Sequence, residues 1–251
     1  MYLIKFINKQ FLPQNKVKLC VVAKGQNKIK ISLENLGIKV IECDGTEKLD
    51  YPIRNHPDIN LFHLGGENII CDRNNTDLIN KIAEENFNII KSQSEVSSPY
   101  PNDVSLNIMI LNNKLWCGKN ADDYIIKYAA ESKIQPILLN QGYVKCTTCI
   151  VNEISVITSD KGTAEMFKAN GLDVLLINHG EIDLPGYDYG FIGGCCGLID
   201  KNTLAFTGDI SRHTDFEKIK AFLSERGVKY ISLTNERLID IGSIIPLKEF
   251  V

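Results

Sequence analysis

Several features are scarce in this chain, and each absence narrows the class of protein. No window approaches 18 consecutive apolar residues, so the sequence predicts no membrane-spanning helix and no membrane partner. The net charge is -3, with 28 basic and 31 acidic side chains, so we expect no nucleic-acid partner. No Gly-rich loop carries the Lys that a nucleotide phosphate needs, and no Gly-x-Ser-x-Gly elbow is present. We therefore expect no cofactor.

The cysteines are also too few to form a disulfide scaffold. Eight in 251 residues suit a reduced protein, and most lie in or beside apolar runs, where cysteine acts as a small hydrophobe. In Cys146-x-x-Cys149, strand alternation would point the two sulfurs to opposite faces, and no second ligand pair follows at finger-like spacing. We therefore expect no metal site. The N-terminal stretch lacks a signal-peptide pattern, which predicts a cytoplasmic location.

What the chain does contain is an internal repeat. Its clearest copy is FIGGCCGLIDKNTLAFTGD at residues 191–209, where a Gly-rich apolar run, a polar turn and a second apolar run precede a helical pattern. The first apolar runs of the copies begin at intervals of 44, 45, 41 and 45 residues, obtained by subtracting successive starting positions. These positions are Lys16, Asn60, Ser105, Cys146 and Phe191.

The repeat predicts an α/β fold with five strand-strand-helix-strand units in a single domain, residues 1–251. Each unit alone would expose an apolar sheet face and an apolar helix stripe, so neighbouring units must bury them. Arranging the units around an axis would also remove long free sheet edges. The units span about 16–43, 60–91, 105–140, 146–177 and 191–233, with a closing strand at 239–247 that joins the last unit to the first. In the first unit, Lys28–Ile31 is the predicted second strand, and residues 44–59 are interpreted as a connector.

This repeat layout resembles the pentein fold, a five-bladed α/β propeller with a pseudo-fivefold axis. Further resemblance comes from the Gly-Gly-acid pattern at Gly65-Gly66-Glu67 and from the stretches GYDYGFIGG, AFTGD and DIGSIIPL, which are similar to those of an uncharacterised bacterial family of stand-alone pentein domains. The resemblance implies a relationship to guanidine-modifying enzymes such as deiminases, dimethylarginine hydrolases and amidinotransferases. Those enzymes place a nucleophilic cysteine, a histidine and acids around the axis. The tail of this chain carries Ser243 but no cysteine.

Candidate substrate-binding residues follow from aligning the repeats with one another. Placing Gly65-Gly66 on Gly193-Gly194 puts Glu67 opposite Cys195 and Asn68 opposite Cys196. Equating Met109, Cys149 and Gly197 then predicts a ring around the axis. Its members are Glu67, Asn107, Thr147 and Cys195, and a slip of one residue would substitute Asn68 and Cys196.

The chemistry of these residues suits a guanidine-type small molecule. A carboxylate such as Glu67 can bind the planar guanidinium fork by two hydrogen bonds, and a thiolate from Cys195 or Cys196 could attack its central carbon. His63 and His179 are the candidate proton carriers. The first hypothesis is therefore a Cys-dependent hydrolase or amidinotransferase. The alternative is a non-catalytic binding or assembly module of the same fold, with the cysteines serving only as packing residues. The sequence leaves the oligomeric state open.

Overall fold

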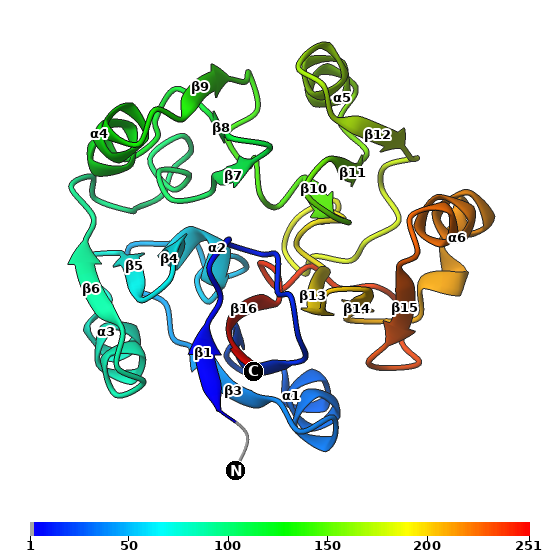
Figure 1. The fold of residues 1–251 in the computed structure, drawn as a ribbon, viewed down its shortest axis with the longest axis horizontal. Coiled ribbons are helices and arrows are strands. Elements are labelled where there is room, and N and C mark those ends of the chain that lie inside the picture. The colour runs from blue at the N-terminus through cyan, green and yellow to red at the C-terminus, as the bar shows by residue number, and fades with distance from the viewer. Residues whose placement is uncertain (1–2) are drawn as a thin grey trace.

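Five small sheets surround the middle of the molecule in chain order (Figure 1). The structure is a computed structural model that describes residues 3–251. The sheets fit the five predicted repeats, and the fold is of the mixed α/β type. Among the residues described, no helix has the length and apolar character needed to cross a membrane.

Four of the sheets have three strands in sequence order, and the first sheet has an additional edge strand. The first sheet runs β1 (Ile4–Phe6), β16 (Ile245–Phe250), β2 (Val17–Ala23) and β3 (Lys39–Cys43). The second contains β4 (Leu61–Gly65), β5 (Asn68–Cys71) and β6 (Asn88–Lys91). The third contains β7 (Met109–Leu111), β8 (Lys114–Cys117) and β9 (Gln135–Leu138). The fourth and fifth contain β10 (Thr148–Ile150), β11 (Ser155–Thr158) and β12 (Asp173–Leu176), and β13 (Cys196–Asp200), β14 (Thr203–Phe206) and β15 (Lys229–Ser232).

One helix follows the central strand of every sheet and returns the chain to the parallel third strand. These helices are α1 (Asn27–Asn35), α3 (Thr76–Ala83), α4 (Asp123–Glu131), α5 (Lys161–Ala169) and α6 (Phe216–Glu225). Each buries a narrow apolar stripe, as Leu78 and Ile82 do on α3, because residues four apart share a helix face. A short helix, α2 (Pro57–Asn60), and a 3-10 turn at Ile210–Arg212 lie outside this pattern.

The first sheet is completed by the C-terminal strand. β16 pairs antiparallel with β2, and β2 pairs parallel with β3, so the tail supplies the strand that the other sheets take from their own repeat. The closing strand, Ile245–Phe250, begins later than the predicted 239–247. The prediction of a strand at Lys28–Ile31 was wrong, because these residues lie in α1 and bury Ile29 together with Leu33.

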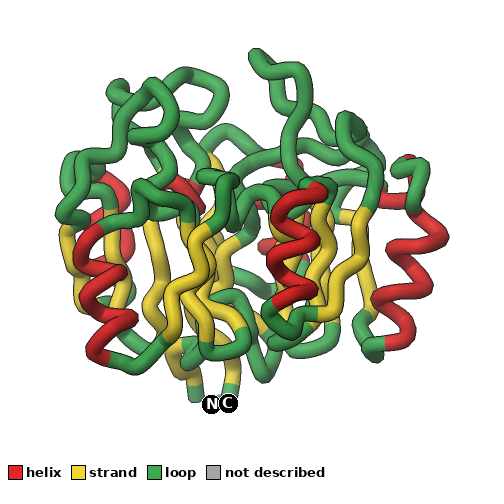
Figure 2. Tube along the Cα trace, turned by 90° about the horizontal axis from the view of Figure 1, so that it is seen from above, coloured by secondary structure: helices red, strands yellow, loops and turns green. Residues whose placement is uncertain are grey.

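The molecule has two different ends. Figure 2 shows the longer loops gathered at one end, which we call the loop end, and both termini at the other. We call β4, β7, β10 and β13 the first strands of their sheets, and in the first sheet β16 takes this place and ends at the C-terminus, away from the loop end. Residues just before a first strand therefore converge at the loop end, whereas hairpin residues lie beside the termini.

Candidate functional site

A cavity of about 260 Å³ lies at the loop end of the molecule. Aliphatic and aromatic side chains form most of its wall, together with an imidazole, a thiol and two carboxylates. The lining residues are Ile53, His56, Ile59, Tyr143, Cys146, Tyr187, Asp188, Tyr189, Phe191 and Asp240.

The lining residues share a position in the repeat, because most of them come just before a first strand. His56 precedes α2 and β4, Cys146 precedes β10, Phe191 precedes β13 and Asp240 precedes β16. Pro57 fixes the first residue of α2, where its missing N–H costs nothing. This common placement explains how residues far apart in the sequence meet in one site.

Asp240 is a buried carboxylate held in a fixed orientation. Its side chain accepts hydrogen bonds from the backbone N–H groups of Gly242 and Phe191, both at 2.9 Å. Burial nevertheless raises the pKa of Asp240 from 3.8 to about 6, because the charged form loses its hydration. A cation placed in the cavity would reverse this penalty.

The backbone packs closely behind Asp240. A Cβ atom added to Gly194 would lie 1.9 Å from Asp240 Oδ1, so only glycine fits there. The Gly-rich stretch before β13 therefore serves to bring the backbone against the carboxylate.

His56 faces Asp240 from the other side of the cavity. Its Nδ1 atom lies 3.7 Å from Asp240 Oδ1, which is too far for a hydrogen bond, and it has no other hydrogen-bond partner among the described residues. The side chain is buried, and burial lowers the pKa of His56 from 6.5 to about 4. The imidazole is therefore neutral at physiological pH.

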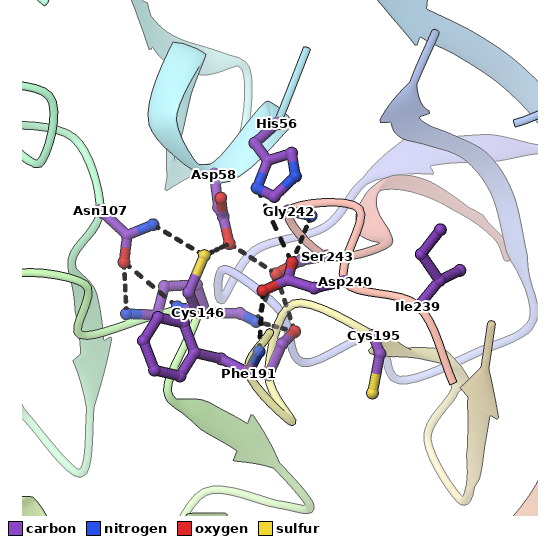
Figure 3. Close-up of polar contacts among 12 residues, drawn as sticks. His56, Asp58, Asn107, Cys146, Phe191, Cys195, Ile239, Asp240, Gly242 and Ser243 are labelled. Atoms are coloured by element: carbon purple, nitrogen blue, oxygen red, sulfur yellow. Dashed lines mark hydrogen bonds and ion pairs between the residues drawn. The ribbon is translucent and has the colours of Figure 1, made fainter. Parts of the chain in front are cut away.

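Cys146 is the thiol that lines the cavity. Its Sγ atom donates to Asp58 Oδ2 at 2.9 Å, and the Asn107 Nδ2 amide donates to the sulfur at 3.3 Å (Figure 3). Burial, and then the negative charge of Asp58, raise the pKa of Cys146 well above its usual value. The resting group is thus a thiol with a buried carboxylate in position to accept its proton.

Asp58 links the cavity thiol to a second buried group, Ser243. Ser243 Oγ lies 2.8 Å from Asp58 Oδ2, accepts a hydrogen bond from Lys145 Nζ at 2.8 Å, and lies 2.9 Å from the Gly193 carbonyl. Ser243 has a φ of +80°, a conformation that side chains other than glycine rarely adopt. The hydroxyl is fully buried, so this network supports the cavity floor rather than opening into it.

The aromatic part of the wall is continuous. The Phe191 ring centroid lies 6.0 Å from those of both Tyr143 and Tyr189. The Tyr143 hydroxyl donates to Asp103 Oδ2 at 2.6 Å, which anchors its ring. Such faces attract cations, because aromatic rings carry negative charge above and below their plane.

The structure places the predicted nucleophiles behind this cavity. Cys195 and Cys196 are buried in the largest apolar cluster, and neither lines the cavity. Cys195 Sγ donates to the Ile192 carbonyl at 3.2 Å, and Figure 3 shows this sulfur pointing away from His56 and Asp58. The Cys196 thiol interacts with that of Cys149.

The predicted substrate carboxylate lies at the other end of the molecule. Glu67 is exposed in the turn between β4 and β5, and Asn68 opens β5 beside it. His63 is buried within β4, where its Nε2 atom lies 2.9 Å from the Gly66 carbonyl. The five residues of β4, about 13 Å of strand, separate this turn from the loop end. Glu67 and Cys195 are therefore not brought together, and the predicted ring is not formed.

The repeat alignment explains this displacement. Phe62, Met109, Cys149 and Gly197 each pair with the penultimate residue of the following strand. The equation of Met109, Cys149 and Gly197 therefore agrees with the observed register. In the structure Gly197 is equivalent to Phe62, a difference of 135 residues, whereas the predicted alignment equated Gly193 with Gly65, a difference of 128. The predicted alignment of the second repeat is therefore seven residues too far along the chain. Its residue equivalent to Asn107 is the buried Asn60, two positions before Phe62.

The remaining predicted residues lie at the loop end. Asn107 is in the site: its side-chain oxygen accepts the backbone N–H groups of Lys145 and Cys146, at 2.8 and 3.1 Å. The Thr147 hydroxyl donates to the backbone carbonyls of Tyr143 and Val144 and so stabilises the same loop. His179 is exposed and packs against Tyr189, with ring centroids 5.6 Å apart.

Sequence reasoning missed most of the residues that line the cavity. His56 and Asp58 lie in the stretch taken as a connector, and Asp240 lies in the tail taken as a closing strand. One signal could have found them. Short polar motifs, the His-Pro-Asp of residues 56–58 and the Asp-x-Gly-Ser of residues 240–243, recur shortly before first strands.

Comparison with known proteins identifies both a family and a fold. Residues 20–245 match the family of unknown function DUF6873. Comparison with curated proteins finds no match. The structure is similar to inosamine-phosphate amidinotransferase from Streptomyces griseus, with 10% identity, a TM-score of 0.57, and coverage of 93% of this chain and 92% of that one. It is also similar to DDAH from Pseudomonas aeruginosa solved with citrulline, with 8% identity, a TM-score of 0.56, and 86% and 92% coverage.

A third similar structure is agmatine deiminase from C. jejuni, with 11% identity, a TM-score of 0.53, and coverage of 93% of this chain and 91% of that one. At these identities the likeness shows the fold alone, which is that of the pentein superfamily. The match over residues 20–245 covers most of the chain. The protein therefore belongs to the DUF6873 family and has the pentein fold.

Proposed function

We propose that this protein binds a guanidine-type small molecule in the cavity at the loop end, as a guanidine-modifying member of the pentein superfamily. The five sheets are the blades of a five-bladed propeller, and the cavity lies at one end of its pseudo-fivefold axis. The proposed binding partner is this small molecule.

The observation that carries this proposal is the Asp240 carboxylate, buried in an aromatic-walled cavity that has no Lys or Arg in its lining. Buried Lys145 lies outside the lining and lowers the pKa of Asp240, but burial outweighs this effect and leaves that pKa raised, so the cavity still favours a positively charged ligand. Each Asp240 oxygen accepts one backbone N–H and keeps a lone pair for a ligand donor. A guanidinium group can use both oxygens at once while its flat face contacts Phe191.

The size of the cavity supports a small ligand. Its volume of about 260 Å³ is below the range of roughly 300–1,000 Å³ that drug-sized molecules occupy. Asp188 is exposed at the rim and adds a second negative charge. The cavity therefore suits a guanidinium head with a short substituent.

Cys146 is the nucleophile in the catalytic form of this proposal. Its thiol proton passes to Asp58 Oδ2, 2.9 Å away, as the sulfur bonds to the guanidinium carbon. Collapse of the adduct breaks one C–N bond, and the departing amine takes back the proton that Asp58 received. Water or a second amine then displaces the sulfur, which distinguishes a hydrolase from an amidinotransferase. Neutral His56, with a ring nitrogen within 4.8 Å of the Cys146 sulfur, accepts the proton of that second nucleophile and returns it to the released thiolate.

A non-catalytic binding module is the second candidate, and the state of the thiol favours it. The raised pKa of Cys146 leaves very little thiolate, and only the thiolate is strongly nucleophilic. The tail position carries Ser243, whose hydroxyl is fully engaged in the floor network. In this case the cavity binds the cation without changing it.

Two measurements on metal-free protein separate these candidates. The first is calorimetric titration with methylguanidine, for which we expect one site per chain, with binding lost in Asp240→Asn. The control is Asp188→Asn, which changes an exposed carboxylate at the rim and should retain most of the affinity. Absence of binding to the wild-type protein would overturn the proposed function.

The second measurement is intact-mass labelling with a small amidine electrophile. A catalytic site predicts one adduct at Cys146 that forms quickly and is blocked by methylguanidine. Cys146→Ser should abolish the adduct, whereas Cys149→Ser, which removes a buried thiol outside the cavity, should not. Binding of methylguanidine without labelling would support the binding module, and protected labelling at Cys195 or Cys196 would contradict the assignment of Cys146.

A further inference from the structure

The floor of the cavity brings three metal-ligating side chains together. His56, Cys146 and Asp240 each offer one ligand atom, and these atoms all lie within 4.8 Å of one another. They come from three separate segments of the chain, and all three are buried. We propose that His56, Cys146 and Asp240 bind a zinc ion.

Buried polar atoms without hydrogen-bond partners at this site indicate a ligand. His56 Nδ1 is buried without a hydrogen-bond partner among the described residues, and only 3% of the residue surface is exposed. Buried polar atoms nearly always have a partner, so an orphaned ring nitrogen beside a cavity calls for one. Asp58 Oδ1, next to the Cys146 thiol, is unpartnered in the same way.

The spacing is close to that of a formed site. Zinc binds nitrogen and oxygen at about 2.0–2.2 Å and sulfur at about 2.3 Å, so two ligand atoms on one tetrahedral ion lie roughly 3.3–3.6 Å apart. His56 Nδ1 and Asp240 Oδ1 already lie 3.7 Å apart. The remaining distances between ligand atoms are at most 4.8 Å, which exceeds the tetrahedral range by only about 1 Å.

The donor set selects zinc over other common ions. Thiolate and imidazole together suit zinc, whereas magnesium and calcium prefer oxygen ligands only. Three protein ligands leave the fourth tetrahedral position open toward the cavity. Binding also releases one proton, because the Cys146 thiol must become a thiolate, and that proton can leave through Asp58 Oδ2 at 2.9 Å.

Groups behind the ligands hold two of them in place. The backbone N–H groups of Gly242 and Phe191 donate to Asp240, and the Asn107 amide donates to the Cys146 sulfur. Such outer hydrogen bonds orient metal ligands in known sites. The zinc site goes beyond the proposed function, because zinc would take the same carboxylate and thiol that a guanidinium needs. The two ligands should therefore exclude each other.

Cobalt and zinc titrations of chelator-stripped protein, without any guanidine, test the site. We expect one Co²⁺ per chain, with a near-ultraviolet thiolate-to-cobalt band that stoichiometric Zn²⁺ removes. Cys146→Ser should eliminate the band, and His56→Gln should weaken zinc binding by more than about 100-fold, beyond the loss of an outer-shell partner. Circular dichroism melts will establish that each variant folds.

Two matched variants make the test specific. His63→Gln alters another buried histidine whose Nδ1 is also unpartnered, but which lies outside the cluster. Cys149→Ser alters a buried thiol three positions away. Both should bind zinc like the wild-type protein. Absence of stoichiometric binding, or equal losses in His63→Gln and His56→Gln, would overturn the zinc site.

The result is independent of the proposed function. Metal binding is measured without guanidine, and methylguanidine binding is measured in chelator. If zinc fails and methylguanidine binds, only the zinc site is wrong. If zinc binds and methylguanidine does not, only the proposed function is wrong.

Discussion

Replacing Asp240 with Asn should change how the stability of the protein depends on pH. The folded protein raises the pKa of Asp240 from 3.8 to about 6, so between these values the folded state binds more protons than the unfolded state. Protonation of Asp240 therefore stabilises the wild-type protein as the pH falls through 6, and this contribution is lost again as the pH rises. Asn cannot supply it.

The expected magnitude follows from the size of the shift. A difference of about 2.2 pKa units corresponds to about 3 kcal/mol, of which about 2–3 kcal/mol develops between pH 7 and pH 4. His56 acts in the opposite direction: its pKa is lowered from 6.5 to about 4, so acidification destabilises the fold. In the wild-type protein the two effects partly cancel. Asp240→Asn removes the Asp240 contribution and should lose about 2–3 kcal/mol more than the wild-type protein between pH 7 and pH 4.

The assay is urea unfolding of both proteins at pH 4, 5, 6 and 7 in the presence of chelator. Urea is required because guanidinium chloride would supply the proposed ligand. The difference between the two proteins at each pH cancels the groups that lie far from Asp240, whereas neighbouring His56 contributes to it. Parallel curves for wild type and Asp240→Asn would refute the claim that burial destabilises the charged form of Asp240.

Four further predictions concern the cavity and helix α5. Gly194→Ala would place a Cβ atom 1.9 Å from Asp240 Oδ1, so urea melts should show a loss of about 1–3 kcal/mol and calorimetry a loss of methylguanidine binding; stability equal to wild type would contradict the close packing. Gly162→Ala, on α5 with its nearest neighbouring atom at 3.6 Å, should instead stabilise by about 0.5–1 kcal/mol, whereas Asp160→Ala should cost about 1 kcal/mol because Asp160 caps that helix at 2.6 Å; the same melts measure both, and changes of the opposite sign would contradict them. Phe191→Leu should weaken methylguanidine binding about 2- to 30-fold in calorimetry, the range expected for a cation–π contact, and unchanged affinity would remove that contact from the account.

The fold was largely predictable because each repeat has a recognisable local sequence pattern. Apolar runs separated by polar turns, each followed by an amphipathic helix, predicted five units that fit the five sheets. The first unit was the exception. Its first strand comes from the C-terminal tail, a pairing between residues more than 200 positions apart, and no local pattern distinguishes Lys28–Ile31 in α1 from a short strand.

The cavity was harder to predict because it is built by convergence rather than by a local motif. Asn107, predicted as a substrate-binding member of the axial ring, lies beside the cavity because its repeat was aligned in the observed register. The prediction for Glu67 was misplaced because Gly-Gly pairs have different roles in the two repeats. At the end of β4, Gly65 and Gly66 adopt positive φ angles, whereas Gly194 leaves room for Asp240. The same Gly-Gly sequence therefore occurs at the hairpin end of one sheet and at the loop end of another.

The most direct test of the central claim is a crystal structure of the metal-free protein grown with methylguanidine. We expect planar density in the cavity, with two nitrogen atoms about 2.7–2.9 Å from the oxygens of Asp240 and one face against Phe191. An empty cavity at saturating methylguanidine, or density bound only at the hairpin end beside Glu67, would contradict it.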